Sequence, residues 1–545
     1  MNYKKLLALV LAILMALSLT ACGGGGGGGD KPSEPTYKKT FTYSVGGEPT
    51  YMDPARCGDS VTAEIHNEIW YPLFYLTEDG SPAKGDCIDY TIDDSGTVYT
   101  FKLDPNAKWS DGVALTADQY VYGIKRCIGM GYEDVGYLTM ITNYIVNAEA
   151  HVGDAVADMD DVGVKALDDY TLEITLNAKC PFFVSLLPTQ VFAALRSEFA
   201  TEKDSEWSNT VGYPTTGAFY PTKIDSASEY ILEKNPYFAL ADQVYCDKLI
   251  AKIMPSMEAS QMAFQTGEID YDTSADSSAT KVADLADAID IHGNINYYMN
   301  INCYTSNEAL QNVEIRRALQ LGIDRSAFVT ALDAGDVYYE LYGFLPVGIP
   351  DFNGDFRTNQ DNEHKLVYTD KEAAKAIMEK YGYGPDNTLK LEYYYNQNAM
   401  HDTVSAVIKE QLKDIYVDVT LKTAELRTFF DDRSYGRYDL ARNAFSADYM
   451  DPWNYLELMA IYNDPEGRTF FGDETYDKLL FESMELEGEA RFAKLHEAET
   501  YAIETMCFNV PLFGYGSVSL QKPGTTGVIN NPQANHIFWF VKCPE

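Results

Sequence analysis

The chain has 545 residues, with 82 acidic against 42 basic side chains and a formal net charge of −40. This length exceeds what one hydrophobic core organises, so we expect two or three domains. The acidic balance argues against a basic face that binds nucleic acid or an anionic membrane. Tyrosine is abundant, at 41 residues, and its apolar ring with a polar hydroxyl suits half-wet clefts.

The N-terminus has the features of an export signal. Lys4 and Lys5 precede an apolar run over 6–19. A run of this length is too short to span a bilayer comfortably but suits the core of a signal peptide. It ends in Leu19-Thr20-Ala21-Cys22, which resembles a bacterial lipobox, so we expect cleavage before Cys22 and lipidation of that residue. A plain signal peptide is the alternative.

A glycine-rich stretch after the cysteine predicts a flexible tether. Residues 23–29 are all glycine, and Pro32 and Pro35 follow, so this stretch has little to bury in a core. We therefore expect a signal peptide over 1–21, a lipid-anchored tether over 22–39, and a body that works outside the cytoplasm at a membrane surface.

The sequence has nine cysteines and does not determine which of them, if any, form disulfides. Apart from Cys22 they are widely scattered, with no CxxC pair and no zinc-ligand spacing. An exported protein can form disulfides, and buried free thiols fit the same spacing.

The sequence carries no catalytic or metal-binding motif. HExxH and GxSxG are absent, and the seven histidines have no metal-ligand spacing. Glu64-Ile65-His66-Asn67-Glu68 brings acids and a histidine together, but we expect it on a solvated helix face. Paired carboxylates of the glycosidase kind carry no signal in a chain with 82 acids. We predict no enzymatic activity, no cofactor and no metal site.

Periodic patterns in the first half of the chain predict strands and helices. Thr116 is expected to cap the helix that follows it. The expected helices are 61–71, 117–128 and 256–267, and the expected strands and hairpins are 39–45, 71–76, 87–92, 97–103, 162–176, 217–237 and 268–271.

After residue 295, helical and strand patterns alternate. This order predicts a partly parallel α/β domain with crossover helices. The expected helices are 313–322, 326–334, 371–381, 402–416 and a pair within 474–506, and the expected strands are 389–395, 417–422 and 509–515.

The stretch 438–453 holds the candidate site. It places Arg442 among apolar residues and Asp448 among small and aromatic ones, followed by a turn at Pro452. A strand that runs out into a loop would bring these two charges near one place, with aromatic walls around them. Such a pair could hold a ligand that has both an ammonium and a carboxylate. The alternative is a solvated strand end.

Six short motifs occur in an order that resembles one family. Together they resemble bacterial extracellular solute-binding proteins of family 5, the peptide-binding subunits of oligopeptide and dipeptide ABC transporters, from about residue 40 to the C-terminus. The motifs are Glu48-Pro49 with Met52-Asp53-Pro54, Lys108-Trp109-Ser110-Asp111-Gly112 with Thr116-Ala117-Asp118, Gly163-Val164-Lys165-Ala166-Leu167, Gly217-Ala218-Phe219-Tyr220 with Glu233-Lys234-Asn235-Pro236, Arg316-Arg317-Ala318-Leu319 with Ile323-Asp324-Arg325, and Ala441-Arg442 with Ala447-Asp448-Tyr449.

The resemblance implies an α/β fold of the type II periplasmic-binding-protein kind, with two lobes closing about a hinge and an inserted third domain. It further implies short peptides as ligands, ABC permease and ATPase subunits as partners, and a monomer. The expected domains are lobe I over 40–70, 197–294 and 517–545, an inserted domain over 71–196, and lobe II over 295–516.

The resemblance also assigns site residues by position. Asp448 matches the acid that pairs with the α-ammonium of the ligand, a charge-assisted contact that would reject ligands without the amine. Arg442 and His401 match cationic positions that meet peptide carboxylates. The remaining matches are aromatic: Tyr298 and Tyr515 at wall or backbone-contact positions, and Phe445 in place of a tryptophan.

One departure leaves the ligand open. Oligopeptide binders can place a lysine after the motif Ile323-Asp324-Arg325, and Ala331-Leu332-Asp333 stands there instead. Ligand length is therefore not set by the resemblance. A non-peptide solute such as an oligosaccharide, an opine or a metal complex is an alternative, and so is a receptor that senses peptides without delivering them.

Overall fold

The computed structural model describes residues 36–49, 51–201, 204–275, 288–305, 307–333, 337–358, 365–461, 473–531 and 536–545. Cys22, the predicted signal peptide and the predicted tether up to residue 35 lie outside the described residues. The last tether residues contact the C-terminus, because Tyr37 forms a β-bridge with Pro544. No helix within the described ranges is long and apolar enough to cross a membrane.

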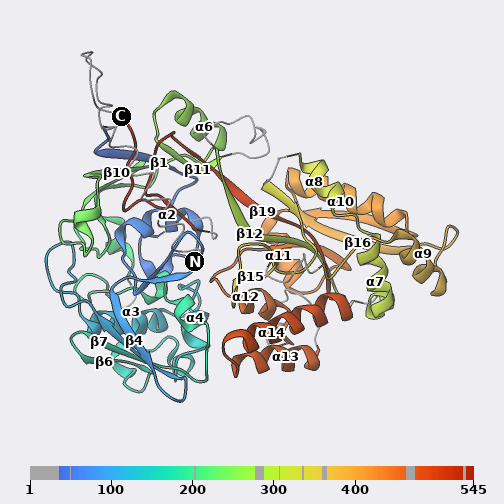
Figure 1. Cartoon of the computed structure of the whole chain (residues 1–545), viewed down its shortest axis with the longest axis horizontal. Coiled ribbons are helices and arrows are strands. Elements are labelled where there is room, and N and C mark those ends of the chain that lie inside the picture. The colour runs from blue at the N-terminus through green and yellow to red at the C-terminus, as the bar shows by residue number, and fades with distance from the viewer. Residues whose placement is uncertain are drawn as a thin grey trace, which may run out of the picture.

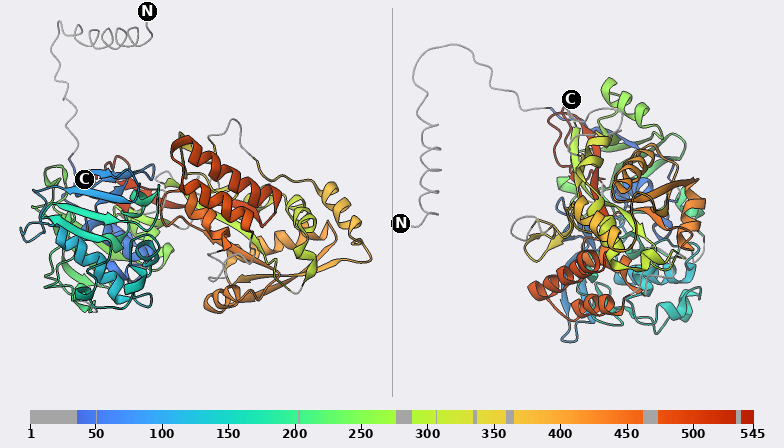
Figure 2. Two further views of the ribbon diagram at one scale, coloured as in Figure 1. Left: turned by 90° about the horizontal axis from the view of Figure 1, so that it is seen from below. Right: turned by 90° about the vertical axis from the view of Figure 1, so that its right-hand side faces the viewer.

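One mixed sheet of 11 strands runs through the molecule, in the order β17-β16-β18-β12-β19-β11-β1-β10-β9-β8, with β13 (Tyr338–Glu340) beside β19. Its long central strands, β12 (Ala288–Ile301) and β19 (Asn509–Gln521), are antiparallel. They extend from one body of the molecule to the other (Figure 1), and the two bodies lie side by side in a second view as well (Figure 2). The expected domain limits at 294 and 516 fall within these two strands.

The first body contains the strands beyond β19. β1 pairs in parallel with β10, and the hairpin of β8 and β9 continues the sheet outward. The strand predicted at 39–45, the hairpin at 217–237 and the helix at 256–267 are confirmed. The bounds are β1 Thr40–Val45, α2 Ser60–Ile69, β8 Phe219–Asp225, β9 Glu229–Lys234, β10 Lys248–Ile253, α6 Met257–Thr266 and β11 Tyr271–Ala275.

A separate antiparallel sheet, in the order β4-β5-β7-β6, forms the lower part of this body in Figure 1. α3 (Ala117–Met130) packs against it. The helix begins after Thr116, whose backbone N–H donates to Oε1 of Gln119 at 3.0 Å, so the predicted start is confirmed. The strand bounds are β4 Cys87–Ile92, β5 Val98–Leu103, β6 Val164–Asp168 and β7 Thr171–Thr175.

The second body has the predicted partly parallel α/β arrangement. β16 and β17 are parallel and connected by α10, and β18 is parallel to β16 on its other side. Apolar side chains of β12, α7, α10 and β16 share one core. The bounds are α7 Val313–Gly322, α8 Ser326–Leu332, α9 Lys371–Lys380, β16 Leu389–Asn396, α10 Ala399–Lys413, β17 Val417–Ala424, α11 Leu426–Ser434, β18 Leu440–Phe445, α13 Glu474–Met484 and α14 Gly488–Thr500.

The structure differs from the prediction after β18. Pro452, expected in a turn, begins the short helix α12 (Pro452–Leu456). Proline fits a first helical turn because its missing N–H has no partner there anyway. Asp451 caps this helix by accepting the backbone N–H of Trp453 at 2.9 Å. The loop 446–451 is thus held between a strand and a capped helix.

Candidate ligand-binding site

A cavity of about 250 Å³ lies between the two bodies. We call it the acid cavity, because Asp59 lines it from the first body and Asp448 from the second. The stretch 71–196 contributes Tyr75 and Tyr137, and the C-terminal segment contributes Trp539. Among the described residues that line it, none is a lysine or an arginine. Its electrostatic character is therefore that of two carboxylates between aromatic walls.

One wall of the acid cavity is α2. Asp59 is its N-cap, and the carboxylate accepts the backbone N–H of Thr62 at 2.8 Å and its hydroxyl at 2.9 Å. His66 and Trp70 follow on the same side of the helix, since residues seven and four apart share one face. Sequence reasoning missed this wall, and the signal that could have found it is the N-cap aspartate just before the helical pattern.

His66 is buried and neutral. Only 1% of its surface is exposed, and neither ring nitrogen has a side-chain hydrogen-bond partner among the described residues. Burial lowers the pKa of His66 to about 4, although Asp53, the backbone of Met52 and Asp59 act in the opposite direction. At neutral pH the ring thus offers one donor and one acceptor. The buried Nε1–H of Trp70 likewise has no partner in the described ranges.

The predicted solvated face over residues 64–68 is wrong. Glu64 is 6% exposed and Glu68 is fully buried. Oε1 of Glu64 lies 2.8 Å from Nδ1 of His536, and a carboxylate oxygen of Glu68 accepts the backbone N–H of Phe538 at 2.8 Å. Burial raises the pKa of Glu68 well above its usual range. The C-terminal segment therefore covers the other side of α2, which leaves the Asp59 side to the cavity.

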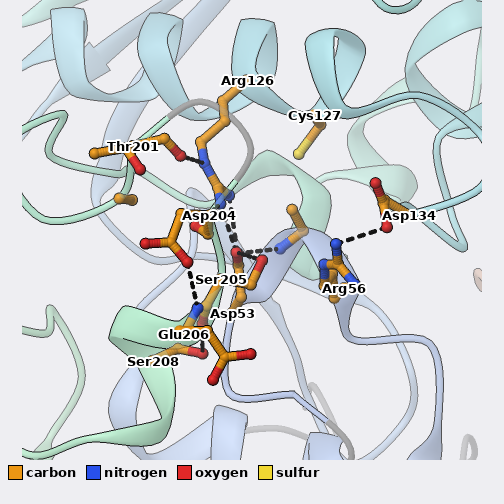
Figure 3. Close-up of polar contacts among 12 residues, drawn as sticks. Asp53, Arg56, Arg126, Cys127, Asp134, Thr201, Asp204, Ser205, Glu206 and Ser208 are labelled. Atoms are coloured by element: carbon orange, nitrogen blue, oxygen red, sulfur yellow. Dashed lines mark hydrogen bonds and ion pairs between the residues drawn. The ribbon is translucent and has the colours of Figure 1, made fainter.

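A buried ion pair fixes the chain just before α2. Figure 3 shows the guanidinium of Arg126 reaching from α3 to the carboxylate of Asp53, with bonds of 2.9 and 2.6 Å. Both side chains are fully buried, and Ser205 donates its hydroxyl to the same carboxylate at 2.6 Å. Arg56 pairs with Asp134 at 2.6 Å nearby. These contacts join the α2 wall to the region that carries Tyr137.

The opposite wall is the loop that carries Asp448. The backbone N–H of Asp448 donates to Oδ1 of Asn454 at 2.7 Å. Asp451, three residues on, forms a buried two-bonded pair with Arg491 at 2.7 and 2.9 Å. The carboxylate of Asp448 is thus presented by a loop whose backbone is anchored on both sides.

Asp59 and Asp448 both influence the pKa of Tyr137. Burial raises the pKa of the Tyr137 hydroxyl, and the charges of Asp448 and Asp59 raise it further. These carboxylates belong to different bodies of the molecule. Tyr137 and both acids are lining residues of the acid cavity.

A second polar group, the arginine cluster, comprises Arg442, His401, Tyr297, Tyr515 and Asn396. Arg442 is 8% exposed, and its Nε–H donates to Oδ1 of Asn396 at 2.7 Å. Within the described ranges, no carboxylate forms an ion pair with Arg442. Nδ1 of His401 lies 3.1 Å from the hydroxyl of Tyr297. The cluster therefore carries a buried positive charge, away from the lining of the acid cavity.

Burial also controls titration in the arginine cluster. It lowers the pKa of His401 to about 4, and the charge of Arg442 acts in the same direction. Burial raises the pKa of Tyr515 to about 12, against the effect of Arg442. At neutral pH the cluster thus holds one cation, a neutral imidazole and protonated phenols.

Tyr298 and Phe445 join neither group. Tyr298 is 1% exposed and packs edge-on against Phe344, at 4.9 Å between ring centroids. Phe445 packs against Tyr455 at 5.2 Å. Arg442 and Phe445 project to opposite faces of β18, because side chains alternate along a strand. The predicted site residues are therefore distributed over the acid cavity, the arginine cluster and the core.

Within the described ranges, the side chains that could bind a metal ion or form a disulfide stay apart. Within the described ranges, no three histidine, cysteine, aspartate or glutamate side chains gather in a way that could hold a metal ion. The eight cysteines there are free thiols, and seven of them are buried. The cysteine spacing is compatible with disulfides or with free thiols, and in this part of the chain the cysteines are free thiols.

Comparisons with known proteins agree with the fold. The family model described as "Bacterial extracellular solute-binding proteins, family 5 Middle" matches residues 83–465. The dipeptide-binding protein DppE of Bacillus subtilis is 26% identical, over 97% of both chains. The oligopeptide-binding protein OppA of the same organism is 27% identical, over 95% of this chain and 96% of the relative.

A solved structure gives the same architecture. The murein tripeptide-binding protein MppA of Escherichia coli has a TM-score of 0.74 and 23% identity, over 94% of this chain and 99% of that chain. This likeness supports the expected α/β fold of type II periplasmic-binding proteins. Proteins of this family are transport binding proteins rather than enzymes. The chain belongs to the bacterial extracellular solute-binding proteins of family 5.

Proposed function

We propose that this protein captures short peptides between its two bodies and delivers them to the permease of an ABC importer. The observation that carries the proposal is the separation of opposite charges on one stretch of chain. Asp448 lines the acid cavity, and Arg442 is buried in the arginine cluster six residues earlier. Relatives named as dipeptide- and oligopeptide-binding proteins support the same ligand class.

In this proposal the α-ammonium of the peptide binds Asp448. An ammonium and a carboxylate in a cavity with little water form a short, charge-assisted hydrogen bond. A ligand without the amine would leave the acid in a closed cavity without that partner, which is costly. Binding would therefore require a free N-terminus.

The peptide carboxylate would bind at the arginine cluster. Arg442 supplies the positive charge, and neutral His401 with Tyr515 supplies hydrogen bonds and an aromatic wall. Tyr298 and Phe445 would contribute to ligand binding indirectly, by packing in the core beneath the strands β12 and β18 that carry them. Six residues of extended chain span at most about 20 Å, which accommodates peptides of about three to five residues.

Closure would occur about β12 and β19, the strands that pass between the bodies (Figure 1). We assign lobe I to 40–70, 197–294 and 517–545, the inserted domain to 71–196 and lobe II to 295–516. Hinge closure would bury the ligand and present a closed form to the permease. Lipidated Cys22 and the glycine tether would hold this monomer at the outer surface of the cell membrane.

Native mass spectrometry of freshly purified protein, followed by calorimetry with tri- to pentapeptides, tests the proposal. We expect a bound peptide mass, and binding of free peptides that is lost on N-acetylation. The Asp448→Asn variant should weaken binding of free peptides by about 30-fold or more, because a buried charge loses its partner. Absence of peptide binding, or equal binding of N-acetylated peptides, would overturn the proposal.

A further inference from the structure

One aromatic side chain of the stretch 71–196 packs against the second body. Phe182 stacks on Tyr449 at 5.1 Å between ring centroids and 13° between ring planes, and on Trp453 at 5.7 Å and 29°. All three residues are buried. Offset rings at such distances attract each other beyond the area that they bury. The two bodies are thus joined by a packed contact of Phe182, Tyr449 and Trp453, which we call the aromatic clasp.

A cation lies against the aromatic clasp. The guanidinium carbon of Arg491 is 5.7 Å from the centroid of the Phe182 ring. Arg491 is itself held by two hydrogen bonds to Asp451, at 2.7 and 2.9 Å. An aromatic face attracts a guanidinium, most strongly where water is excluded. Phe182 therefore contacts the same arginine that anchors the loop carrying Asp448.

The first body contributes more than one side chain to this contact. Burial raises the pKa of the Cys180 thiol well above its usual range, Asp451 raises it further, and Arg491 lowers it. Burial also raises the pKa of the Tyr144 hydroxyl, whereas a hydrogen bond with Tyr449 lowers it. Cys180 and Tyr144 belong to the first body and the groups that act on them to the second. The two bodies therefore meet over a surface to which each contributes several residues.

The aromatic clasp lies next to the acid cavity in the chain. Tyr449 directly follows Asp448, and Phe182 directly precedes the short helix α5 (Phe183–Leu186). Residues 188–190, just after α5, line the cavity from the first body, as Asp448 does from the second. Separation of the bodies at this point would expose three buried aromatic residues to water, which disfavours opening. The clasp is therefore placed to stabilise the cavity in its closed form.

We propose that Phe182 is a positioning residue for ligand capture, which joins the stretch 71–196 to the loop carrying Asp448 and stabilises the closed form. This inference rests on the proposed function and adds the stretch 71–196 to the parts that close on the ligand. Phe182 acts on affinity without touching the ligand. A weakened clasp shifts the protein toward the open form, and apparent affinity falls with the population of the closed form.

Hydrogen exchange of the unliganded protein, measured by mass spectrometry, tests the aromatic clasp. Phe182→Leu keeps an apolar side chain but removes the stacked ring. We expect the amides of 446–456, in the other body, to exchange about 5-fold faster or more. Phe183→Leu is the matched control, because Phe183 is also buried but packs against Tyr99 and Phe192 within the first body. It should leave exchange in 446–456 unchanged.

Calorimetry with tetraalanine, free at both ends, provides the second measurement. Phe182→Leu should weaken binding by about 5- to 10-fold. Phe183→Leu should weaken it by less than about 2-fold, because its contacts lie within one body. In a Tyr449→Leu background, Phe182→Leu should weaken binding by a smaller factor than in the parent protein, since the ring on which it stacks is already absent.

The two measurements separate this inference from the proposed function. Exchange in 446–456 that is equal in Phe182→Leu and Phe183→Leu would overturn the inference, whether or not tetraalanine binds. A rise in Phe182→Leu that extends equally over both bodies would reflect lost stability and would also overturn it. Faster exchange confined to 446–456, with no binding of tetraalanine or of the tri- to pentapeptides by the parent protein, would support the aromatic clasp and contradict the peptide ligand.

Discussion

The arginine cluster and the acid cavity carry opposite charges. The segment from Arg442 to Asp448 connects them. Each nevertheless contains a buried histidine with a pKa near 4. The neighbours of His66 are acids that raise its pKa, whereas Arg442 lowers that of His401. The charged neighbours shift the two pKa values in opposite directions, yet both pKa values are low. Burial therefore determines that both rings are neutral. The charges that remain are those of Asp59 and Asp448 on one side and Arg442 on the other.

The two regions also differ in how their charges are held. The α2 wall follows a fully buried Asp53–Arg126 pair, while Arg442 has no carboxylate partner in the described part of the chain. A charge paired within the fold stabilises the scaffold, and a charge without such a partner is available to a ligand. This contrast favours a role in stability for Asp53 and agrees with the binding role that we propose for Arg442.

The largest expected effect is that of Asp53→Asn. It leaves the guanidinium of Arg126 buried without its counter-ion, so the free energy of unfolding should fall by about 3–5 kcal/mol. Urea denaturation measures this change. Asp134→Asn, which breaks the more exposed pair with Arg56, is the control and should cost less than about 1 kcal/mol. Similar losses in both variants would contradict the contrast between buried and exposed pairs.

Replacing Arg442 should act on binding. Arg442→Gln removes the charged hydrogen-bond donor for the ligand carboxylate, so affinity for peptides with a free C-terminus should fall by about 1.5–3 kcal/mol. That is about 10- to 150-fold. Calorimetry with the same peptides as C-terminal amides should show little difference between variant and parent. Arg437→Gln removes an exposed arginine of the same body, paired with Asp432, and should leave both affinities unchanged.

The local parts of the fold are predictable from sequence because they depend on neighbouring residues. The strand β5 has alternating apolar side chains, and the start of α3 follows from Thr116 and Gln119, which lie three residues apart. Arg442 and Asp448 likewise stand out from one short stretch. Such signals need no knowledge of distant contacts.

The acid cavity could not be predicted in the same way. Acids at 64 and 68 suggest a solvated face, and their burial depends on His536 and Phe538, about 470 residues away. Asp59 is visible in the sequence only as a helix cap. That it lines the same cavity as Asp448 depends on how the two bodies meet, which no local pattern encodes.

The pH dependence of stability tests whether burial lowers the pKa of a histidine, as it does for His66 and His401. The pKa of His66 lies near 4 in the folded protein and near 6.5 when unfolded, so the unfolded state binds more protons as pH falls below 6.5. Stability from this residue is therefore present above pH 6.5 and is lost toward pH 4. Between pH 7.5 and 5 the loss from His66 should be about 2 kcal/mol. Denaturation of His66→Asn should show a correspondingly shallower decline.

His151→Asn is the control with the opposite sign. The hydrogen bond to Asp154 raises the pKa of His151, so this residue stabilises the fold as pH falls. Its removal should make the decline steeper. A decline that is unchanged in His66→Asn would mean that the buried ring does not titrate as its surroundings require.

The smallest expected effect separates burial from charge. In Arg442→Gln the pKa of His401 should rise, because a neighbouring cation has been removed, yet it should stay below 6.5 because burial is the larger cause. Titration of the ring protons by NMR in histidine-labelled protein measures this shift, and the partly exposed His151 provides a reference signal. A pKa at or above 6.5 would show that the cation, rather than burial, keeps His401 neutral. The two histidines would then be neutral for different reasons, and the arginine cluster would change its charge whenever Arg442 is neutralised by a ligand carboxylate.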